Sequence, residues 1–241
     1  MKIKTIIAIA FISLNCTFAT AQSIDPTATY SDSIESIKTL RPGEGYSGSA
    51  PLEVKFEANP SDDSGWNANY EWRFYTEDNM TTPYLIRYEQ DTEYTFNTAG
   101  SHRIVCYAVF TKGNDRVEYT DEYWSQEVRP ISISISESKL EMPNAFSPNN
   151  GDDINNIYKA KKGYKSIVEF RAIIFNRWGK KLYEWHDPAG GWDGTYNGKD
   201  VPQGVYFVLV EAKGADGRKF RIKKDVNLLR GYTEGTSTLT E

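Results

Sequence analysis

Cysteine and histidine are scarce in this chain, which has two of each among its 241 residues. Cys16 lies in the apolar start of the chain, so a mature form without that start keeps only Cys106 and can form no internal disulfide. Asn15 stands where lipoprotein processing needs a small residue, which disfavours a lipid anchor at Cys16. His102 and His186 have no cysteine or second histidine at zinc spacing. These shortages argue against a disulfide-stapled scaffold and a zinc enzyme.

Long apolar runs are also rare, because the only candidate is Ile6 to Leu14. A positive start, Met1 to Lys4, precedes this run, and small residues, Ala19 to Ala21, follow it. Together they predict a Sec-type signal peptide of residues 1–21, cleaved before Gln22. A membrane span needs ~20 apolar residues, more than this run supplies. The mature chain is therefore expected to be secreted, without a transmembrane segment.

Positive charge is scarce in the first part of the mature chain. Residues 22–138 contain 9 basic and 20 acidic side chains, a net charge of −11, whereas residues 139–241 contain 17 and 13, a net charge of +4. Phosphate binding needs clustered Lys and Arg, so the acidic part argues against nucleic acid as a partner. In the second part the basic residues are scattered along expected strands, which favours a solvated sheet face.

Helical periodicity is missing, and short alternating segments take its place. Leu52, Val54 and Phe56 alternate with charged residues, which predicts a strand with one face in a core. Similar patterns predict strands over residues 70–74, 94–96, 104–110 and 131–136, with the apolar 104–110 run central in its sheet. We therefore predict an all-β fold of two tandem β-sandwich (Ig-like) domains after the cleaved signal peptide.

The first of these domains resembles the PKD family of extracellular Ig-like domains. The resemblance is carried by Gly48 to Phe56, by Tyr70-Glu71-Trp72-Arg73-Phe74, by Tyr94-Thr95-Phe96 with Ala99-Gly100, and by the strand from Ile104 to Val109. Tyr75 to Asp78 stands where the family usually has a Gly-Asp-Gly type turn. The resemblance implies an Ig-like binding or spacer unit.

Three motifs in the second half occur in a specific order and spacing. They are Pro143 to Asp152 (PNAFSPNNGD), Phe175 to Tyr183 (FNRWGKKLY) and Trp192 to Tyr206 (WDGTYNGKDVPQGVY). In this order they resemble the gliding-motility-associated C-terminal domain of surface proteins from Bacteroidetes-type bacteria. That resemblance implies recognition by the type IX secretion machinery at the outer membrane, after Sec-dependent export, and attachment at the cell surface.

These segments predict how the chain is divided: a signal peptide (1–21), an entry segment (22–44), a PKD-like sandwich (45–137), a linker (138–142), the gliding-motility-associated β domain (143–230) and a tail (231–241). The entry segment contains one possible edge strand near residues 34–40. In the gliding-motility-associated β domain, strands are expected near residues 168–175, 205–210 and 220–229.

Several motif residues have a physical role that does not depend on the family. Asn197-Gly198 suits a tight hairpin turn with positive φ, and Gly204 permits a bulge or sharp strand entry. Trp178 and Trp192 are large enough to plug a small core, so we expect both to be folding residues. A surface for the sorting machinery is then expected on their exposed neighbours, Arg177, Lys180, Lys181 and Lys199.

The loop from Asn149 to Asn156 concentrates oxygen ligands, as calcium loops do. Asp152, Asp153 and Asn155 are the calcium candidates, but calcium prefers six to eight oxygens with several carboxylates, and only two carboxylates lie here. A turn held by its own Asn and Asp side chains is favoured over a metal site. No other cofactor is expected.

Catalytic motifs are absent from the sequence, and Cys106 lies in the apolar central strand, where an inert buried thiol is favoured over a nucleophile. We therefore expect that the chain is not an enzyme.

The leading hypothesis is an exported surface protein with a PKD-like binding or spacer domain and a C-terminal sorting domain. The alternative is a module that binds surface polysaccharide or protein, through loop aromatics that should form one exposed set: Trp66, Tyr84, Tyr88, Tyr123 and Trp124.

Overall fold

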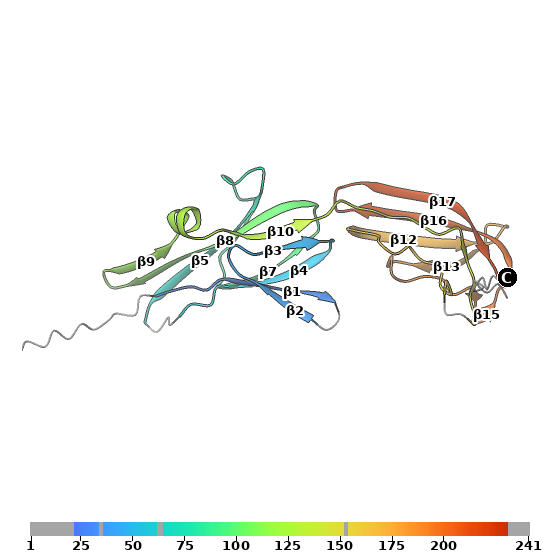
Figure 1. Cartoon of the computed structure of the whole chain (residues 1–241), viewed down its shortest axis with the longest axis horizontal. Helices are drawn as coiled ribbons and strands as arrows, with labels where there is room; N and C mark the ends of the chain where they lie inside the picture. The colour runs from blue at the N-terminus through green and yellow to red at the C-terminus, as the bar shows by residue number, and fades with distance from the viewer. Residues whose placement is uncertain (1–21, 34–35, 62–64, 152–153, 231–241) are drawn as a thin grey trace, which may run out of the picture.

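The computed structural model describes residues 22–33, 36–61, 65–151 and 154–230. The expected signal peptide, the tail, and two calcium candidates, Asp152 and Asp153, lie outside these residues. The described chain is almost entirely β-strand, which confirms the expected all-β class of β-sandwich domains. Figure 1 shows two β domains joined end to end along the long axis of the molecule.

The first domain is a sandwich of two sheets. The four-stranded sheet has the order β2-β1-β4-β7, made of β1 (Thr27–Ser33), β2 (Ser36–Leu40), β4 (Leu52–Glu57) and β7 (Asp91–Phe96). The second sheet has the order β3-β10-β8-β5-β6, with β9 also paired to β8; its strands are β3 (Gly45–Gly48), β5 (Asn67–Thr76), β6 (Leu85–Arg87), β8 (Gly100–Lys112), β9 (Asp115–Tyr119) and β10 (Ile131–Ile135).

The alternation seen in the sequence places the core of this sandwich. Leu52, Val54 and Phe56 of β4 are buried and their charged neighbours are exposed, as the pattern predicts. They pack on Trp72 and Phe74 of β5, and the ring centroids of Phe56 and Phe74 are 5.3 Å apart. β8 lies between β5 on one side and β10 with β9 on the other, so it is central in its sheet as expected, and it carries buried residues on both faces.

The segment expected to be an entry segment belongs to the sandwich. β1 pairs with both β2 and β4, and its Ala28 is fully buried in the same core as Val54. A single π-helical turn, η1 (Tyr123–Glu127), lies between β9 and β10. Neither β1 nor this turn was expected from the sequence, because their apolar residues are few and irregularly spaced.

The second domain is built on one five-stranded sheet with the order β11-β17-β16-β12-β13. Its strands are β11 (Ala145–Phe146), β12 (Ile167–Phe175), β13 (Lys181–Trp185), β16 (Gly204–Gly214) and β17 (Lys219–Leu228). Irregular segments and a two-stranded ribbon of β14 (Thr195–Tyr196) and β15 (Lys199–Asp200) complete the domain. The tight turn expected at Asn197-Gly198 joins this ribbon, with φ of 49° and 71°.

The inner face of this sheet carries the second core. Trp192 and Tyr158 are fully buried there, and their backbones pair through hydrogen bonds of 2.8 and 3.0 Å. The Trp192 indole N–H donates to the carbonyl of Thr195 at 2.8 Å, which satisfies its one polar group. Trp192 therefore has the core role expected from the sequence.

The two domains meet at a junction that is hydrogen-bonded from both sides. The turn between β16 and β17 places Ala215 against the first core, and Ala99 N–H donates to the Ala215 carbonyl at 3.0 Å. Ser138, on the connecting segment, donates through its hydroxyl to Asp216 at 2.7 Å. The buried Ser166 hydroxyl accepts from Ala50 N–H at 3.2 Å. Hydrogen bonds therefore join the two domains to each other and hold the segment that connects them.

Candidate functional site

The turn between β12 and β13 forms the far end of the second domain and displays an exposed tryptophan. Asn176 shapes this turn, since its side-chain oxygen accepts from Trp178 N–H at 3.0 Å and Lys180 N–H at 2.9 Å. Gly179 has φ of 78°, a left-handed conformation that glycine adopts without strain. The turn holds Trp178 away from the core and leaves it 76% exposed.

The expected core role of Trp178 is therefore wrong. The Arg177 guanidinium carbon lies 4.4 Å from the centroid of the Trp178 ring, in a cation–π arrangement on the surface. A large apolar side chain held out in solvent by an ordered turn is typical of contact residues. The sequence signal was available in the Asn-x-Trp-Gly spacing, which is a turn pattern rather than a strand pattern.

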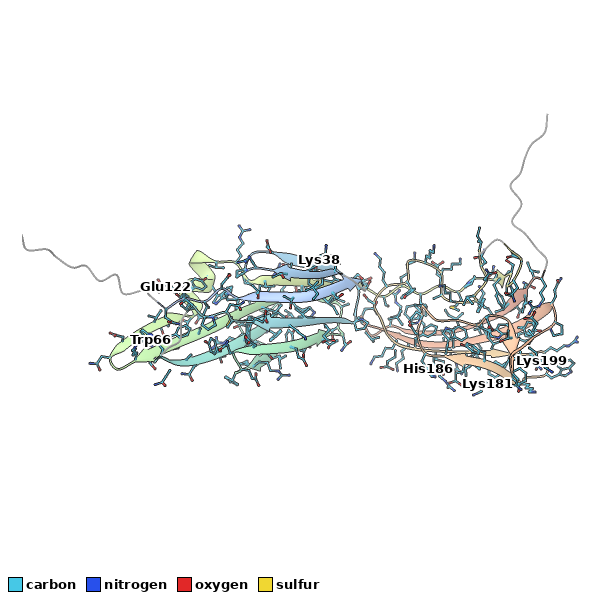
Figure 2. The ribbon with its side chains drawn as sticks, turned by 90° about the horizontal axis from the view of Figure 1, so that it is seen from below. Lys38, Trp66, Glu122, Lys181, His186 and Lys199 are labelled. Atoms are coloured by element: carbon cyan, nitrogen blue, oxygen red, sulfur yellow. The ribbon has the colours of Figure 1, made fainter. Side chains whose placement is uncertain are left out.

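The four cationic sorting candidates are all exposed but do not form one cluster. The ammonium group of Lys180 lies 4.5 Å from the centroid of the Tyr196 ring. Lys199 is paired with Tyr196 across the two-stranded ribbon. Lys181 instead pairs with Glu184 at 2.9 Å, on the edge strand β13. Figure 2 shows Lys181 and Lys199 near the end of the second domain that is remote from the first.

A shallow groove of about 430 Å³ runs beside Trp178. Its walls include Leu182 of β13 and the start of β16, where Val205 is 49% and Phe207 is 41% exposed. Sequence reasoning did not single out these two side chains. The signal for them was the run from Val205 to Val210, which is apolar on both faces, whereas a sheet covered on only one side needs only one apolar face.

Ion pairs fix the edge of the sheet next to this groove. Hydrogen bonds from Arg171 and then Lys181 lower the pKa of the Glu184 carboxyl to about 2, against its ordinary value of 4.5. The hydrogen bond with Glu184 in turn raises the pKa of Arg171. Glu184 is therefore ionised at all physiological pH values and neutralised by its neighbours.

The five aromatic ligand candidates of the first domain do not gather into one exposed set. Trp124 is buried, contrary to expectation, and its indole N–H donates to the Cys106 carbonyl at 2.8 Å. Tyr123 packs edge-on against Trp124 with ring centroids 5.3 Å apart.

The other three candidates are more exposed but are separately engaged. The ammonium of Lys112 lies 5.9 Å from the Trp66 ring centroid, and Tyr84 is bonded to His102 at 3.0 Å. Tyr88 alone is largely exposed, at 70%. Figure 2 places Trp66 at the end of the first domain far from the junction.

Of the three calcium candidates, the structure describes Asn155 alone. Asn155 uses its backbone carbonyl to accept from Ser147 N–H at 2.9 Å, and within the described ranges no three His, Cys, Asp or Glu side chains cluster as a metal site. Burial raises the pKa of the Cys106 thiol far above its ordinary value, so the thiolate form is suppressed. Helices long and apolar enough to cross a bilayer were not found among the residues that the structure describes.

Comparison with known families identifies the second domain. Residues 140–224 match the CHU_C Type IX secretion signal domain, which confirms the resemblance expected from the three motifs and supports a protein sorted by type IX secretion and exported to the cell surface or extracellular space. The PKD resemblance of the first domain stays a prediction. None of the curated proteins compared matches this chain.

Solved structures give only distant likenesses. Dimeric latent PorU from Porphyromonas gingivalis is 11% identical with a TM-score of 0.24, over 87% of this chain and 20% of that one. A tetra-tandem repeat of a large adhesion protein is 11% identical with a TM-score of 0.25, over 87% and 68% of the two chains. Drosophila N-cadherin EC1-4 is 15% identical with a TM-score of 0.24, over 86% and 51%. This chain thus spans a fifth of latent PorU, and these likenesses carry no functional argument.

Proposed function

We propose that this chain is an exported surface or secreted protein with a sorting domain and a display unit. Residues 143–230 act as the sorting and attachment domain for type IX secretion, and the PKD-like sandwich acts as a spacer or binding unit. The signal peptide predicted in residues 1–21 starts export through Sec. The observation that carries the proposal is the match of residues 140–224 to the type IX secretion signal domain.

The arrangement of the second domain supports this role. Trp178 is exposed beside the groove, and Lys181 and Lys199 lie near the end remote from the first domain (Figure 2), where a partner can approach without meeting the first sandwich. The scatter of the aromatic candidates over the first domain favours a spacer over a carbohydrate- or protein-binding module. The proposal assigns no catalytic step, since Cys106 is buried and His102 is engaged in hydrogen bonds.

Export in a type IX-competent host tests the proposal. The intact chain is compared with a chain ending at Glu137, because Leu140 and Met142 are already buried in the second core. We expect the intact chain at the cell surface and the shortened chain in the periplasm, measured by surface-protease accessibility and fractionation. In a second arm, residues 138–241 fused to a Sec-exported reporter should carry it to the surface. If intact and shortened chains travel equally, the sorting role is rejected.

A further inference from the structure

The outer face of the five-stranded sheet is divided into two chemically different halves. Antiparallel partners project to the same face, so the register of β17, β16, β12 and β13 defines rows of neighbouring side chains. From the junction outward, these rows begin with Lys219, Lys213 and Glu169 and end with Asn227 and Val205. Figure 1 shows the strands β17, β16 and β12, which run between the junction and the far end of the second domain.

The half near the junction is a charged surface whose side chains are linked by ion pairs. Lys213 pairs with Glu169 at 3.3 Å, and Glu211 lies 3.9 Å from Arg171 and 3.7 Å from Arg221. Charged side chains paired in this way are typical of a sheet face that is exposed to solvent.

The half remote from the junction is apolar at its centre. We call it the distal outer face and define it by six residues: Ile173, Phe175, Trp178, Val205, Phe207 and Leu209. Phe175 is the strand partner of Phe207, and Ile173 is the partner of Leu209. Ile173 is buried, yet it belongs to neither core cluster. Large side chains thus pack on each other outside the core.

Keeping such a surface in water is unfavourable, by about 25 cal/mol for each Å² of apolar area. Val205, Phe207 and Trp178 remain 49%, 41% and 76% exposed. Folding of the domain does not need them there, because the core is formed by the opposite faces of the same strands. A contiguous exposed apolar patch on an ordered sheet, with a polar border, is typical of a protein contact surface.

The border of the distal outer face is basic. Its cations are Arg177, Lys180, Lys181 and Lys223, and its anions are Glu184 and Asp225. The Glu184 charge is already balanced by Arg171 and Lys181, with contacts of 2.8 and 2.9 Å. An isologous contact between two copies would bring these cations together, which is unfavourable.

We propose that the distal outer face is the docking surface of the sorting domain, and that its occupant is a protein surface of the outer-membrane secretion machinery with an apolar centre and an acidic border. This inference rests on the proposed function and deepens it by naming the contact face and the chemistry of the partner. Phe207 and Trp178 lie at the centre of the contact, and Lys223 lies on its border.

The apolar centre is tested in the full chain by Phe207→Lys against Ile157→Lys, in the same export assay. Ile157 is a matched control, because it is 40% exposed, near the 41% of Phe207, and adjoins Tyr158 of the inner core on the other side of the sheet. We expect surface export of Phe207→Lys to fall by on the order of tenfold, as for a central contact residue, while Ile157→Lys is exported like the unchanged chain. Equal melting temperatures of the purified proteins establish that both fold.

The acidic border of the partner is tested by Lys223→Glu against Lys219→Glu. Both lysines are exposed on the outer face of β17, but only Lys223 borders the distal half. Export should fall for Lys223→Glu and stay unchanged for Lys219→Glu. Equal export of the two variants would overturn the inference that the partner surface has an acidic border.

Other results would overturn the docking face itself. If removal of residues 143–230 blocks export but Phe207→Lys is exported normally, the sorting role stands and this surface is rejected. If the purified chain sediments as a dimer that Phe207→Lys dissociates, the occupant is a second copy. If a chain ending at Arg230 loses export to the same degree and Phe207→Lys adds no further loss, the occupant is the chain's own tail.

Discussion

His102 is a buried side chain whose two ring nitrogens both have partners. Nε2 lies 3.2 Å from the Thr98 carbonyl, which can only accept, so Nε2 carries the proton. Nδ1 then accepts from the Tyr84 hydroxyl at 3.0 Å. This arrangement satisfies a neutral imidazole, and a second proton on Nδ1 would remove the bond that Tyr84 donates.

Stability of the first domain should therefore fall in mild acid. Burial lowers the pKa of His102 below its ordinary value of 6.5. Below about pH 6.5 the unfolded chain binds a proton at this position that the folded chain does not, so the free energy of unfolding decreases as the pH falls. Urea midpoints between pH 7.5 and 5 should decline, and His102→Gln should flatten that decline. His186→Gln, at an exposed histidine, is the control, and an equal effect of both changes would contradict the assignment to His102.

At the level of elements, the irregular layer of the second domain depends on one close backbone approach. Tyr158 and Trp192 pair as an isolated bridge, and Gly191 lies directly beside it. A Cβ on Gly191 would lie 2.4 Å from the Tyr158 carbonyl oxygen, too close for any real contact. Only glycine, which has no Cβ, therefore allows the backbone at position 191 to approach Tyr158 this closely.

Gly191→Ala should destabilise the second domain by about 1–3 kcal/mol, because the two segments must move apart. Gly190→Ala is the matched control, since a Cβ there would lie 3.3 Å from the Asp187 carbonyl oxygen and needs only a small adjustment. The measurement is urea unfolding followed by tryptophan fluorescence, to which the buried Trp185 and Trp192 of the second core contribute. Similar losses for the two variants would show that the bridge is not the limiting contact.

The strands that sequence analysis predicted are those with strict alternation or a long apolar run. β4 and β10 show one-sided alternation, and β8, apolar on both faces, carries buried residues on both, so pattern and burial agree. β1 was missed because only alternate small or polar residues, such as Ala28, enter the core. Local pattern does not reveal pairing with a strand that lies far along the chain.

The candidate surface was predicted only in part, for a related reason. Basic residues near Trp178 were expected at the surface, and they are exposed. Size and a neighbouring Gly do not separate Trp178 from Trp192, because both suit a core. The Asn-x-Trp-Gly spacing does separate them, because Asn176 holds the turn that exposes Trp178. Phe207 was hidden for another reason, because an apolar residue in a two-sided apolar strand reads as buried.

At the scale of the whole molecule, the segment that connects the two domains is held by hydrogen bonds. Asp216 accepts from Ser138 through both side-chain oxygens, at 2.7 Å from the hydroxyl and 3.1 Å from the backbone N–H. Lys139 and Lys165 exchange backbone hydrogen bonds of 2.9 and 3.0 Å on the same segment. The connecting chain is thus held like a strand rather than a free linker.

Asp216→Ala should loosen this connection without unfolding either domain. Removal of both acceptors frees the segment around Ser138, so trypsin should cut at Lys139 several-fold faster, because cleavage requires local opening. Asp187→Ala is the control, as Asp187 makes a comparable bond to Ala189 N–H at 2.8 Å away from the junction. Equal cleavage rates for the two variants would show that Asp216 does not hold the segment.

The end-to-end arrangement separates the first domain from the distal outer face by the length of the second domain. β16 runs from the distal outer face to the junction with 11 residues, which at ~3.3 Å per residue corresponds to about 35 Å. Electrostatic forces between exposed charges are screened over ~8 Å at physiological salt. The first domain, with its net charge of −11 over residues 22–138, therefore stands several screening lengths from whatever holds the far end. The docking proposal and the acidic first domain are therefore compatible, because an acidic partner at the far end lies beyond the range of that repulsion.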